Sequence, residues 1–588
     1  MKLKTLILLL LISISIFAQT EKIKIIETSD IHGAIFPYNF SNQKELHNSL
    51  AHITTYIKQQ RADTTQTVIL IDNGDILQGD PSVYYYNFEK NDSRHFLANV
   101  MNFMKYDAGT VGNHDIEPGH KIYDKFNSEI NFPWLAANAI NTKINEPYFK
   151  PYHILRVPIK NSDKQIKIAI LGLITPGIPN WLPRNIWSGI EFEDMIITAK
   201  KWVPIIQEKE KPNLLIGVFH SGIDFTYSNQ TAETFRNENA SQLVAEQVPG
   251  FDIVFVGHDH HEWNFKVANP NGDSVLILGP TSKARSVAEA DIEFKFKNNT
   301  VGKEIIGHVN NLNDVQPDKE FVERFSNEFK EIKKYISRKI GTLNKTISAE
   351  ESLFGNSLFV DLIHKVQLEI TNADISFTAP LSMHTKIDSG NIYVKDMFDL
   401  YRYENLLYTM ELSGEEILDY LEYSYADWFN TIKDANDNLL LFEKDKEGKI
   451  IKSERSNSAM LKNRYYNFDS AEGIDYVVDV TKPIGERVKI ISFTNGTPFK
   501  LEQKYKVAIN SYRGNGGGGH LVEGAGIPKK ELSSRVIKST EKDLRYYMMK
   551  WIEEQKVIDL EETKNWKIIP EDLVDKVILT DKVLLLGN

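Results

Sequence analysis

Short apolar runs recur through the first half of the chain, and several are followed at once by polar residues of a few kinds. "KIKIIETSDIHG" and "TVILIDNGDILQGD" are two of them. Runs of about four to eight apolar and β-branched residues that end in glycine-containing turns are typical of buried strands. The segments between them, such as "HNSLAHITTYIKQQRAD", have the apolar spacing of helices. This alternation predicts an α/β fold for residues 22–317.

Polar residues stand directly after five of these runs. Ligands of an open α/β sheet collect beyond the carboxyl ends of its strands, so we expect these five ends to converge on one site. Each residue taken alone is more often structural, as a turn or core residue. Together, however, carboxylate, amide oxygen and imidazole suit two divalent ions such as Mn, Zn, Co or Fe. The predicted metal ligands are Asp30, His32, Asp75, Asn113, His220, His258 and His260.

Spacing and chemistry both indicate a shared centre. Residues two apart in an extended chain point the same way, which lets Asp30 act with His32 and His258 act with His260. Asp75 has two carboxylate oxygens and can bridge two ions roughly 3.5–4 Å apart. Such a pair of ions can activate water and hold a phosphoryl oxygen, which is the chemistry of phosphate ester hydrolysis.

The motifs "SDIHG", "NGDILQGD", "GNHD", "FHSG" and "GHDHH" resemble those of the calcineurin-like metallophosphoesterase family over residues 22–290. The unit that follows resembles the C-terminal domain of the 5′-nucleotidase family. The resemblance implies a four-layer αββα catalytic domain joined by a helix to a substrate-binding domain. It also implies that Asp30, His32, Asp75 and His260 bind one metal, and that Asp75, Asn113, His220 and His258 bind the other.

The residues after Asn113 carry a second expectation. By the resemblance, His114 is not a ligand but lies beside the substrate phosphate and stabilises charge in the transition state or on the leaving oxygen. Many 5′-nucleotidases have an aspartate three residues later that orients this ring, and here Glu117 stands in its place. Asp115 is expected to cap or orient the loop.

The second unit departs from the 5′-nucleotidase pattern. After "NADISFT" it lacks the glycines and the arginine that help those enzymes to hold substrate. Its segments "TAPL", "DLYRYENLLYTMEL" and "INSYRGNGGGGH" are similar instead to the bifunctional 2′,3′-cyclic-nucleotide 2′-phosphodiesterase/3′-nucleotidases. That similarity implies that Tyr403 and Tyr512 stack on the nucleobase, an interaction that tolerates any base. On the residues alone, without this similarity, either tyrosine could equally be a half-buried strand residue.

Two neighbours of Tyr512 are also candidates. Asn510 is expected to contact the nucleotide, whereas Arg513 could hydrogen-bond a base or brace the loop. The predicted activity is hydrolysis of 2′,3′-cyclic nucleotides to 3′-nucleotides, and of 3′-nucleotides to nucleoside and phosphate. The alternatives are a 5′-nucleotidase or nucleotide-sugar hydrolase, and a non-catalytic exported nucleotide-binding protein.

Composition and the chain's two ends complete the expectations. The net charge of −11 argues against a nucleic acid polymer as partner, and the absence of cysteine excludes thiolate ligands. Residues 1–18 combine Lys2 and Lys4 with an apolar core too short to span a bilayer, which predicts a cleaved signal sequence, no stable membrane anchor, and a periplasmic or secreted protein. The predicted units are 1–18, the catalytic domain 22–317, a linker helix 318–341, a nucleotide-binding domain 342–545 and a tail 546–588.

Overall fold

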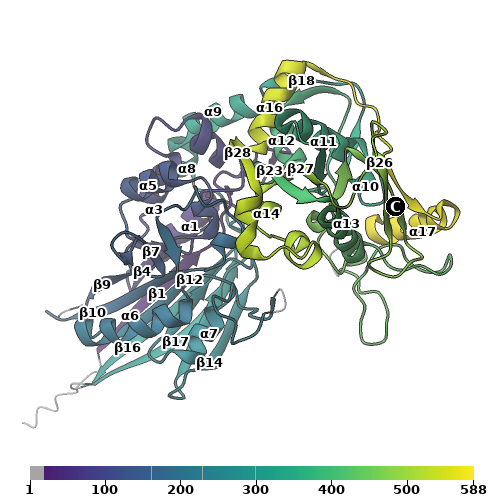
Figure 1. The fold of residues 1–588 in the computed structure, drawn as a ribbon. Helices are drawn as coiled ribbons and strands as arrows, with labels where there is room; N and C mark the ends of the chain where they lie inside the picture. The colour runs from purple at the N-terminus through teal and green to yellow at the C-terminus, as the bar shows by residue number, and fades with distance from the viewer. Residues whose placement is uncertain (1–18, 161, 228–229, 298–299, 454–455, 588) are drawn as a thin grey trace, which may run out of the picture.

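The computed structural model describes residues 19–160, 162–227, 230–297, 300–453 and 456–587. The predicted signal sequence therefore lies outside the described residues. The N-terminal half forms one domain at the lower left of Figure 1, and the C-terminal half forms a second at the upper right. Within the ranges that the structure describes, no helix is both long enough and apolar enough to cross a membrane.

Two six-stranded sheets form the N-terminal domain. The first consists of β1 (Gln19–Thr28), β4 (Gln66–Asp72), β5 (Ala108–Thr110), β6 (Trp134–Leu135), β16 (Ser286–Lys297) and β17 (Thr300–Asn311). The second consists of β9 (Tyr152–Pro158), β10 (Gln165–Ile174), β12 (Leu214–His220), β13 (Ile253–Val256), β14 (Trp263–Ala268) and β15 (Ser274–Gly279). The strand orders are β17-β16-β1-β4-β5-β6 and β14-β15-β13-β12-β10-β9.

The two sheets pack face to face and are covered by helices on their outer faces. Ile25 and Ile69 of the first sheet share a buried cluster with Ile168 and Ile216 of the second. α1 (Leu50–Ala62) packs on the outer face of the first sheet, while α6 (Met195–Glu210) and α7 (Ser241–Gln247) cover the second. The predicted four-layer αββα architecture is confirmed.

Parallel pairing brings the strand ends to one edge. Thr28 of β1 pairs with Asp72 of β4, and Asp72 in turn pairs with Gly109 of β5. In the second sheet, Ile174 of β10 pairs with His220 at the end of β12. The shorter helices of this domain are α2 (Pro81–Tyr84), α3 (Phe96–Met104), α4 (Asn113–Ile116) and α5 (His120–Glu129).

The predicted linker helix over 318–341 is instead two helices and the start of a strand. α8 (Lys319–Arg324) and α9 (Ser326–Ile336) are separated at Phe325, and β18 (Lys339–Leu343) follows. Phe325 leaves the helical conformation, with φ −101° and ψ 19°, and its ring packs on those of Phe96 and Phe103 in the N-terminal domain. The helix cannot continue to 341 because β18 pairs with two other strands of the C-terminal domain.

The C-terminal domain is built on a five-stranded sheet with the order β24-β20-β27-β23-β28. These strands are β20 (Ile375–Thr378), β23 (Leu406–Ser413), β24 (Ser470–Glu472), β27 (Lys504–Asn510) and β28 (Val536–Asp543). A smaller sheet contains β25 (Ile474–Asp479), β26 (Val488–Phe493) and β30 (Trp566–Ile569), and β18 pairs with β22 (Gly390–Tyr393) and β29 (Val557–Ile558). The helices are α10 (Ala349–Ser352), α11 (Leu358–Thr371), α12 (Val394–Leu400), α13 (Gly414–Trp428), α14 (Ser511–Gly514), α15 (Leu532–Arg535), α16 (Leu544–Gln555) and α17 (Glu571–Leu586).

The last residues of the chain are part of this domain. The predicted boundary at 545 falls inside α16, and β30 pairs with β25 of the smaller sheet. α17 contributes Val574, Val577 and Leu585 to the domain's core. The segment predicted as a tail is therefore docked on the body of the domain.

The two domains are joined by direct contacts as well as by the linker. The ring of Tyr84 in α2 lies 5.3 Å from that of Phe398 in α12, and its hydroxyl donates to Asp543 Oδ2 at 3.1 Å. The side chain of Asn515 donates to the carbonyl of Trp181 at 3.4 Å. One apolar cluster runs through both domains, which holds their facing surfaces together.

Candidate functional site

The fold brings all seven predicted metal ligands to the same edge of the two sheets. Asp30 and His32 follow β1, Asp75 follows β4, Asn113 opens α4 after β5, His220 ends β12, and His258 and His260 follow β13. Six of them form two groups of three, and within each group the ligand atoms lie within 4.8 Å of one another. The groups are Asp30, His32 and His260, and Asp75, His220 and His258.

In the first group, imidazole nitrogens face a buried carboxylate. His260 Nε2 lies 3.3 Å from Asp30 Oδ1, and His32 Nε2 lies 3.9 Å from the same oxygen. His32 Nδ1 is 3.0 Å from Gln78 Oε1 on its other side, which fixes the ring with Nε2 toward the centre.

Asp75 links the two groups. Its Oδ2 lies 3.1 Å from His220 Nε2 in its own group and 3.8 Å from His32 Nε2 in the other. Asn113 completes the second group, because its Oδ1 lies 3.1 Å from His220 Nε2 and 2.9 Å from His258 Nδ1. The assignment of these residues to two individual ions stays a prediction.

The backbone of the site is held in an unusual conformation. Asp30, His32, Asp75, His258 and His260 all have positive φ, between 44° and 80°. Non-glycine residues rarely adopt this region, and such strain persists where the surrounding structure enforces it. Five of the seven predicted ligands share this feature, which is typical of a functional site.

Asp115 and Gly112 hold the Asp75 loop in place. The Asp115 carboxylate accepts the backbone N–H groups of Asp75 and Leu77 at 2.9 Å and that of Gly112 at 2.8 Å. A Cβ atom at Gly112 would come within 2.2 Å of Asp75 Oδ1, so only glycine lets the two loops approach. Asp115 therefore orients the loop, as the sequence suggested.

The charges of the site fit metal cations. Asp30 and Asp75 are buried, and the surrounding imidazoles hold their pKa values below the usual range despite the cost of burial. Burial opposes protonation of His220, but the charge of Asp75 outweighs it and raises the pKa of His220 to about 10. Two buried, ionised carboxylates such as those of Asp30 and Asp75 are costly unless positive charge lies nearby. Oxygen and imidazole donors together suit two divalent ions.

His114 lies beside this centre with its ring held from one side. Its backbone N–H donates to Asp75 Oδ1 at 2.8 Å, and its Nδ1 lies 2.5 Å from Glu117 Oε2. Burial disfavours the charged ring, but Asp75 and Glu117 outweigh it and raise the pKa of His114 to about 9. The ring is 31% exposed, so it is accessible to a ligand.

A cavity of about 260 Å³ lies between the domains and is lined by both. Asn113, His114 and His258 border it from the metal side. Tyr403, Asn510 and Tyr512 border it from the C-terminal domain, so the structure brings the predicted substrate residues to the predicted catalytic ones. The remaining lining residues are Glu117, Trp181, Leu182, Glu238, Leu381, Asn405 and Tyr466.

The glycine-rich loop after β27 positions Tyr512. A Cβ atom at Gly517 would lie 2.5 Å from a ring carbon of Tyr512, so the loop backbone packs directly on that ring. Arg513 is buried and pairs with Asp469 through two hydrogen bonds of 3.0 Å. Arg513 therefore braces the loop. Asn510 Oδ1 accepts the N–H of Arg513 at 3.0 Å, which leaves the amide nitrogen of its side chain for another partner.

Several cavity residues were not predicted from the sequence. The ring of Trp181 stacks on that of His258 with centroids 5.7 Å apart, and Tyr466 meets Tyr403 edge to face at 6.1 Å. Glu238 lies 3.3 Å from His258 Nε2. Trp181 and Glu238 lie in loops without periodicity, so no sequence pattern marks them.

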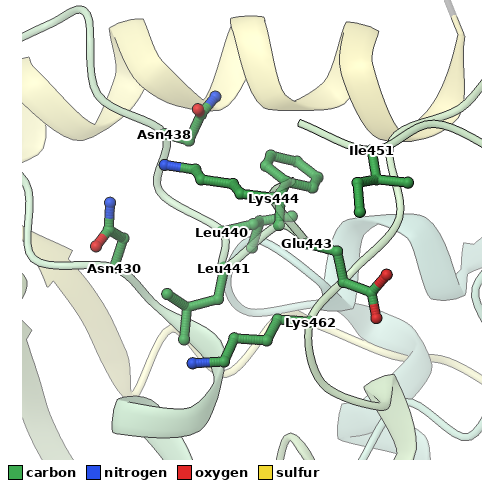
Figure 2. Close-up of a pocket in the computed structure, with 9 residues that line it drawn as sticks. Asn430, Asn438, Leu440, Leu441, Glu443, Lys444, Ile451 and Lys462 are labelled. Atoms are coloured by element: carbon green, nitrogen blue, oxygen red, sulfur yellow. The ribbon is translucent and has the colours of Figure 1, made fainter. Parts of the chain in front are cut away.

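A second hollow, of about 450 Å³, lies in the loops next to α17 (Figure 2). It is lined by Asn438, Leu440 and Lys444 among others, and Asn438 donates to Asp581 of α17 at 2.6 Å. None of the residues predicted to bind metal or nucleotide lines this hollow.

Comparison with known proteins places both domains. Residues 23–262 match the calcineurin-like phosphoesterase family, and residues 339–523 match the 5′-nucleotidase C-terminal domain. The trifunctional nucleotide phosphoesterase protein YfkN of Bacillus subtilis is 26% identical over 93% of this chain, which spans only 39% of that protein's length.

A second relative is of similar length to this chain. The 2′,3′-cyclic-nucleotide 2′-phosphodiesterase/3′-nucleotidase of Yersinia enterocolitica is 25% identical over 85% of this chain and 81% of its own. Among solved structures, a candidate 5′-nucleotidase from Staphylococcus aureus superposes with a TM-score of 0.73 at 19% identity, covering 93% of this chain and 100% of its own. The chain therefore belongs to the calcineurin-like metallophosphoesterases that carry a 5′-nucleotidase C-terminal domain.

Proposed function

We propose that this phosphohydrolase is an exported enzyme that converts 2′,3′-cyclic nucleotides to 3′-nucleotides, and 3′-nucleotides to nucleoside and phosphate. The observation that carries the proposal is the shared cavity, which is lined by Asn113 and His114 of one domain and by Tyr403 and Tyr512 of the other. If the phosphate of a nucleotide binds beside Asn113 and His114, its base lies in the same cavity as Tyr403 and Tyr512. The Yersinia enterocolitica relative has a name that describes this pair of activities.

Two divalent ions, of the kinds Mn, Zn, Co or Fe, would be held by the seven predicted ligands and would supply a nucleophilic water and positive charge for the phosphoryl oxygens. In the first reaction a water oxygen bonds to phosphorus, the bond from phosphorus to the 2′ oxygen breaks, and that oxygen takes a proton. In the second reaction the bond to the 3′ oxygen breaks in the same way.

The chain's own residues orient the reacting groups. Glu117 holds Nδ1 of His114, so Nε2 is free to donate to the phosphoryl or leaving oxygen. No lysine or arginine is among the described residues that line the cavity. His114 is therefore the side chain that meets the substrate's negative charge beside the metals.

The nucleoside is held by the C-terminal domain in this proposal. Tyr403 and Tyr512 offer aromatic faces for a base of any kind, and Asn510 offers an amide N–H. Leu381, which follows "TAP", lines the cavity in the segment where 5′-nucleotidases have their glycine and arginine motif. This departure favours the cyclic phosphodiesterase over a 5′-nucleotidase or nucleotide-sugar hydrolase.

The test compares phosphate and nucleoside release from 2′,3′-cyclic AMP, 3′-AMP and 5′-AMP with added Mn²⁺. We expect turnover of the first two, little turnover of the third, and loss of activity in His114→Ala. A preference for 5′-AMP would overturn the proposal in favour of a 5′-nucleotidase. Binding of all three without turnover would favour a nucleotide-binding protein.

A further inference from the structure

We infer that Glu238 is a specificity residue that binds the 5′-hydroxyl of the nucleotide's ribose. Glu238 lines the cavity between the domains, and its side chain is 18% exposed there. The inference rests on the proposed function, since it concerns how the same cavity holds its substrate.

The loop that carries Glu238 is tightly fixed. The carbonyl of Glu238 accepts the hydroxyls of Thr175 and Ser221 at 3.0 and 2.8 Å. The residues on either side, Asn237 and Asn239, are buried, and their side chains donate to backbone carbonyls of the same loop at 2.9 and 3.0 Å. Glu238 is therefore presented to the cavity by a rigid backbone.

One carboxylate oxygen of Glu238 is occupied and the other is free for a ligand. Oε1 lies 3.3 Å from His258 Nε2, while Oε2 accepts no hydrogen bond from any residue that the structure describes. Glu117, the other acid that lines the cavity, hydrogen-bonds through Oε2 to His114 Nδ1 at 2.5 Å. Glu238 Oε2 is thus a carboxylate oxygen that remains available to a ligand of this cavity.

The chemistry of the substrate selects its partner. A carboxylate repels phosphate but accepts hydrogen bonds from ribose hydroxyls. In a nucleoside 2′,3′-cyclic phosphate both the 2′ and the 3′ oxygens are esterified, so the 5′-hydroxyl is the one free hydroxyl of the sugar. Glu238 Oε2 accepts from that hydroxyl, and the same charge disfavours a phosphate on C5′.

The experiment measures binding of adenosine and of 5′-deoxyadenosine by calorimetry, with Mn²⁺ present and no turnover required. The wild type is expected to bind adenosine roughly 10-fold more tightly, since a hydrogen bond to a charged group is lost with the hydroxyl. Glu238→Ala is expected to bind both equally. Glu233→Ala, an exposed glutamate of the same loop, is the control and keeps the preference.

Metal content and turnover separate this inference from its rivals. If the wild type shows no preference, or Glu238→Ala keeps it, the inference is wrong. If Glu238→Ala loses Mn²⁺ but still binds adenosine more tightly than 5′-deoxyadenosine, the inference is wrong, and Glu238 serves instead to hold His258. The proposed function fails separately, if 2′,3′-cyclic AMP is not hydrolysed.

Discussion

Asp75 and His114 are joined by a direct hydrogen bond, in which the backbone N–H of His114 donates to Asp75 Oδ1 at 2.8 Å. The other oxygen of Asp75 lies 3.1 Å from His220 Nε2. One carboxylate thus fixes the position of the proposed general acid and also stands between the two groups of candidate metal ligands. Any change at Asp75 must therefore affect both.

Asp75→Asn is expected to lower the metal content at both positions and to reduce kcat at least about 100-fold, because a neutral amide cannot bridge two cations. Metal content by mass spectrometry and the rate on 2′,3′-cyclic AMP measure the two effects. Asp163→Asn, at an exposed position, serves as the control. Retention of two metals by Asp75→Asn would contradict a bridging role.

Glu117→Gln is expected to lower kcat by about 10- to 100-fold with little change in KM or metal content, since it weakens the partner that orients the His114 ring without touching a metal ligand. Glu117→Asp, which restores the carboxylate on a shorter stem, should recover part of the rate. Steady-state kinetics beside the exposed control Glu146→Gln provide the measurement. An unchanged kcat in Glu117→Gln would show that His114 needs no carboxylate.

Tyr512→Ala is expected to raise KM for 2′,3′-cyclic AMP by about 5- to 150-fold, which corresponds to the loss of one base stacked on an aromatic ring. The rate on bis-p-nitrophenyl phosphate, which has no nucleobase, should change little. Comparison of the two substrates isolates the contribution of the C-terminal domain. Equal losses on both would mean that the substitution disturbs the metal centre instead.

His364 predicts a loss of stability in acid. It is buried between Ser376 and Ser470, and burial lowers its pKa from 6.5 to about 3. The unfolded chain binds a proton below pH 6.5 while the folded chain does not, so the stability present above that pH is lost as the pH falls toward 3. Between pH 6.5 and 5 this one residue contributes a loss of about 2 kcal/mol.

His364→Gln should therefore be less stable than the wild type at pH 7.5 but should lose less stability between pH 7.5 and 5. Urea unfolding followed by fluorescence at the two pH values checks this. Part of the pH dependence remains in the variant, because burial also lowers the pKa values of His95 and His520 to about 3. Identical losses in variant and wild type would show that His364 is protonated in the folded protein.

The sequence could predict that the candidate metal ligands come together, because each stands at the end of a strand. Parallel sheets bring such ends together whatever the loops between them do: all seven residues lie at one edge, and six of them form the two candidate metal-binding groups. His114, which directly follows Asn113, was predicted from the family resemblance. The sequence alone could not reveal the left-handed backbone at Asp30 or Asp75, because that conformation is imposed by neighbouring loops.

Other features depend on contacts between distant parts of the chain. The bracing role of Arg513 is set by Asp469, 44 residues away, and no local pattern connects the two. Glu238 and Trp181 reach the cavity from loops whose course is fixed by tertiary packing. The amphipathic pattern over 318–341 predicted helical structure, which α8 and α9 contain. It could not show that Phe325 leaves the helical conformation and packs on Phe96.

Phosphorus NMR of 2′,3′-cyclic AMP during its hydrolysis by the protein with Mn²⁺ follows both proposed reactions in one experiment. We expect 3′-AMP to form first and then to disappear as inorganic phosphate rises, with both steps lost in His114→Ala. Accumulation of 2′-AMP, or an inert cyclic nucleotide beside rapid hydrolysis of 5′-AMP, would contradict the proposed function.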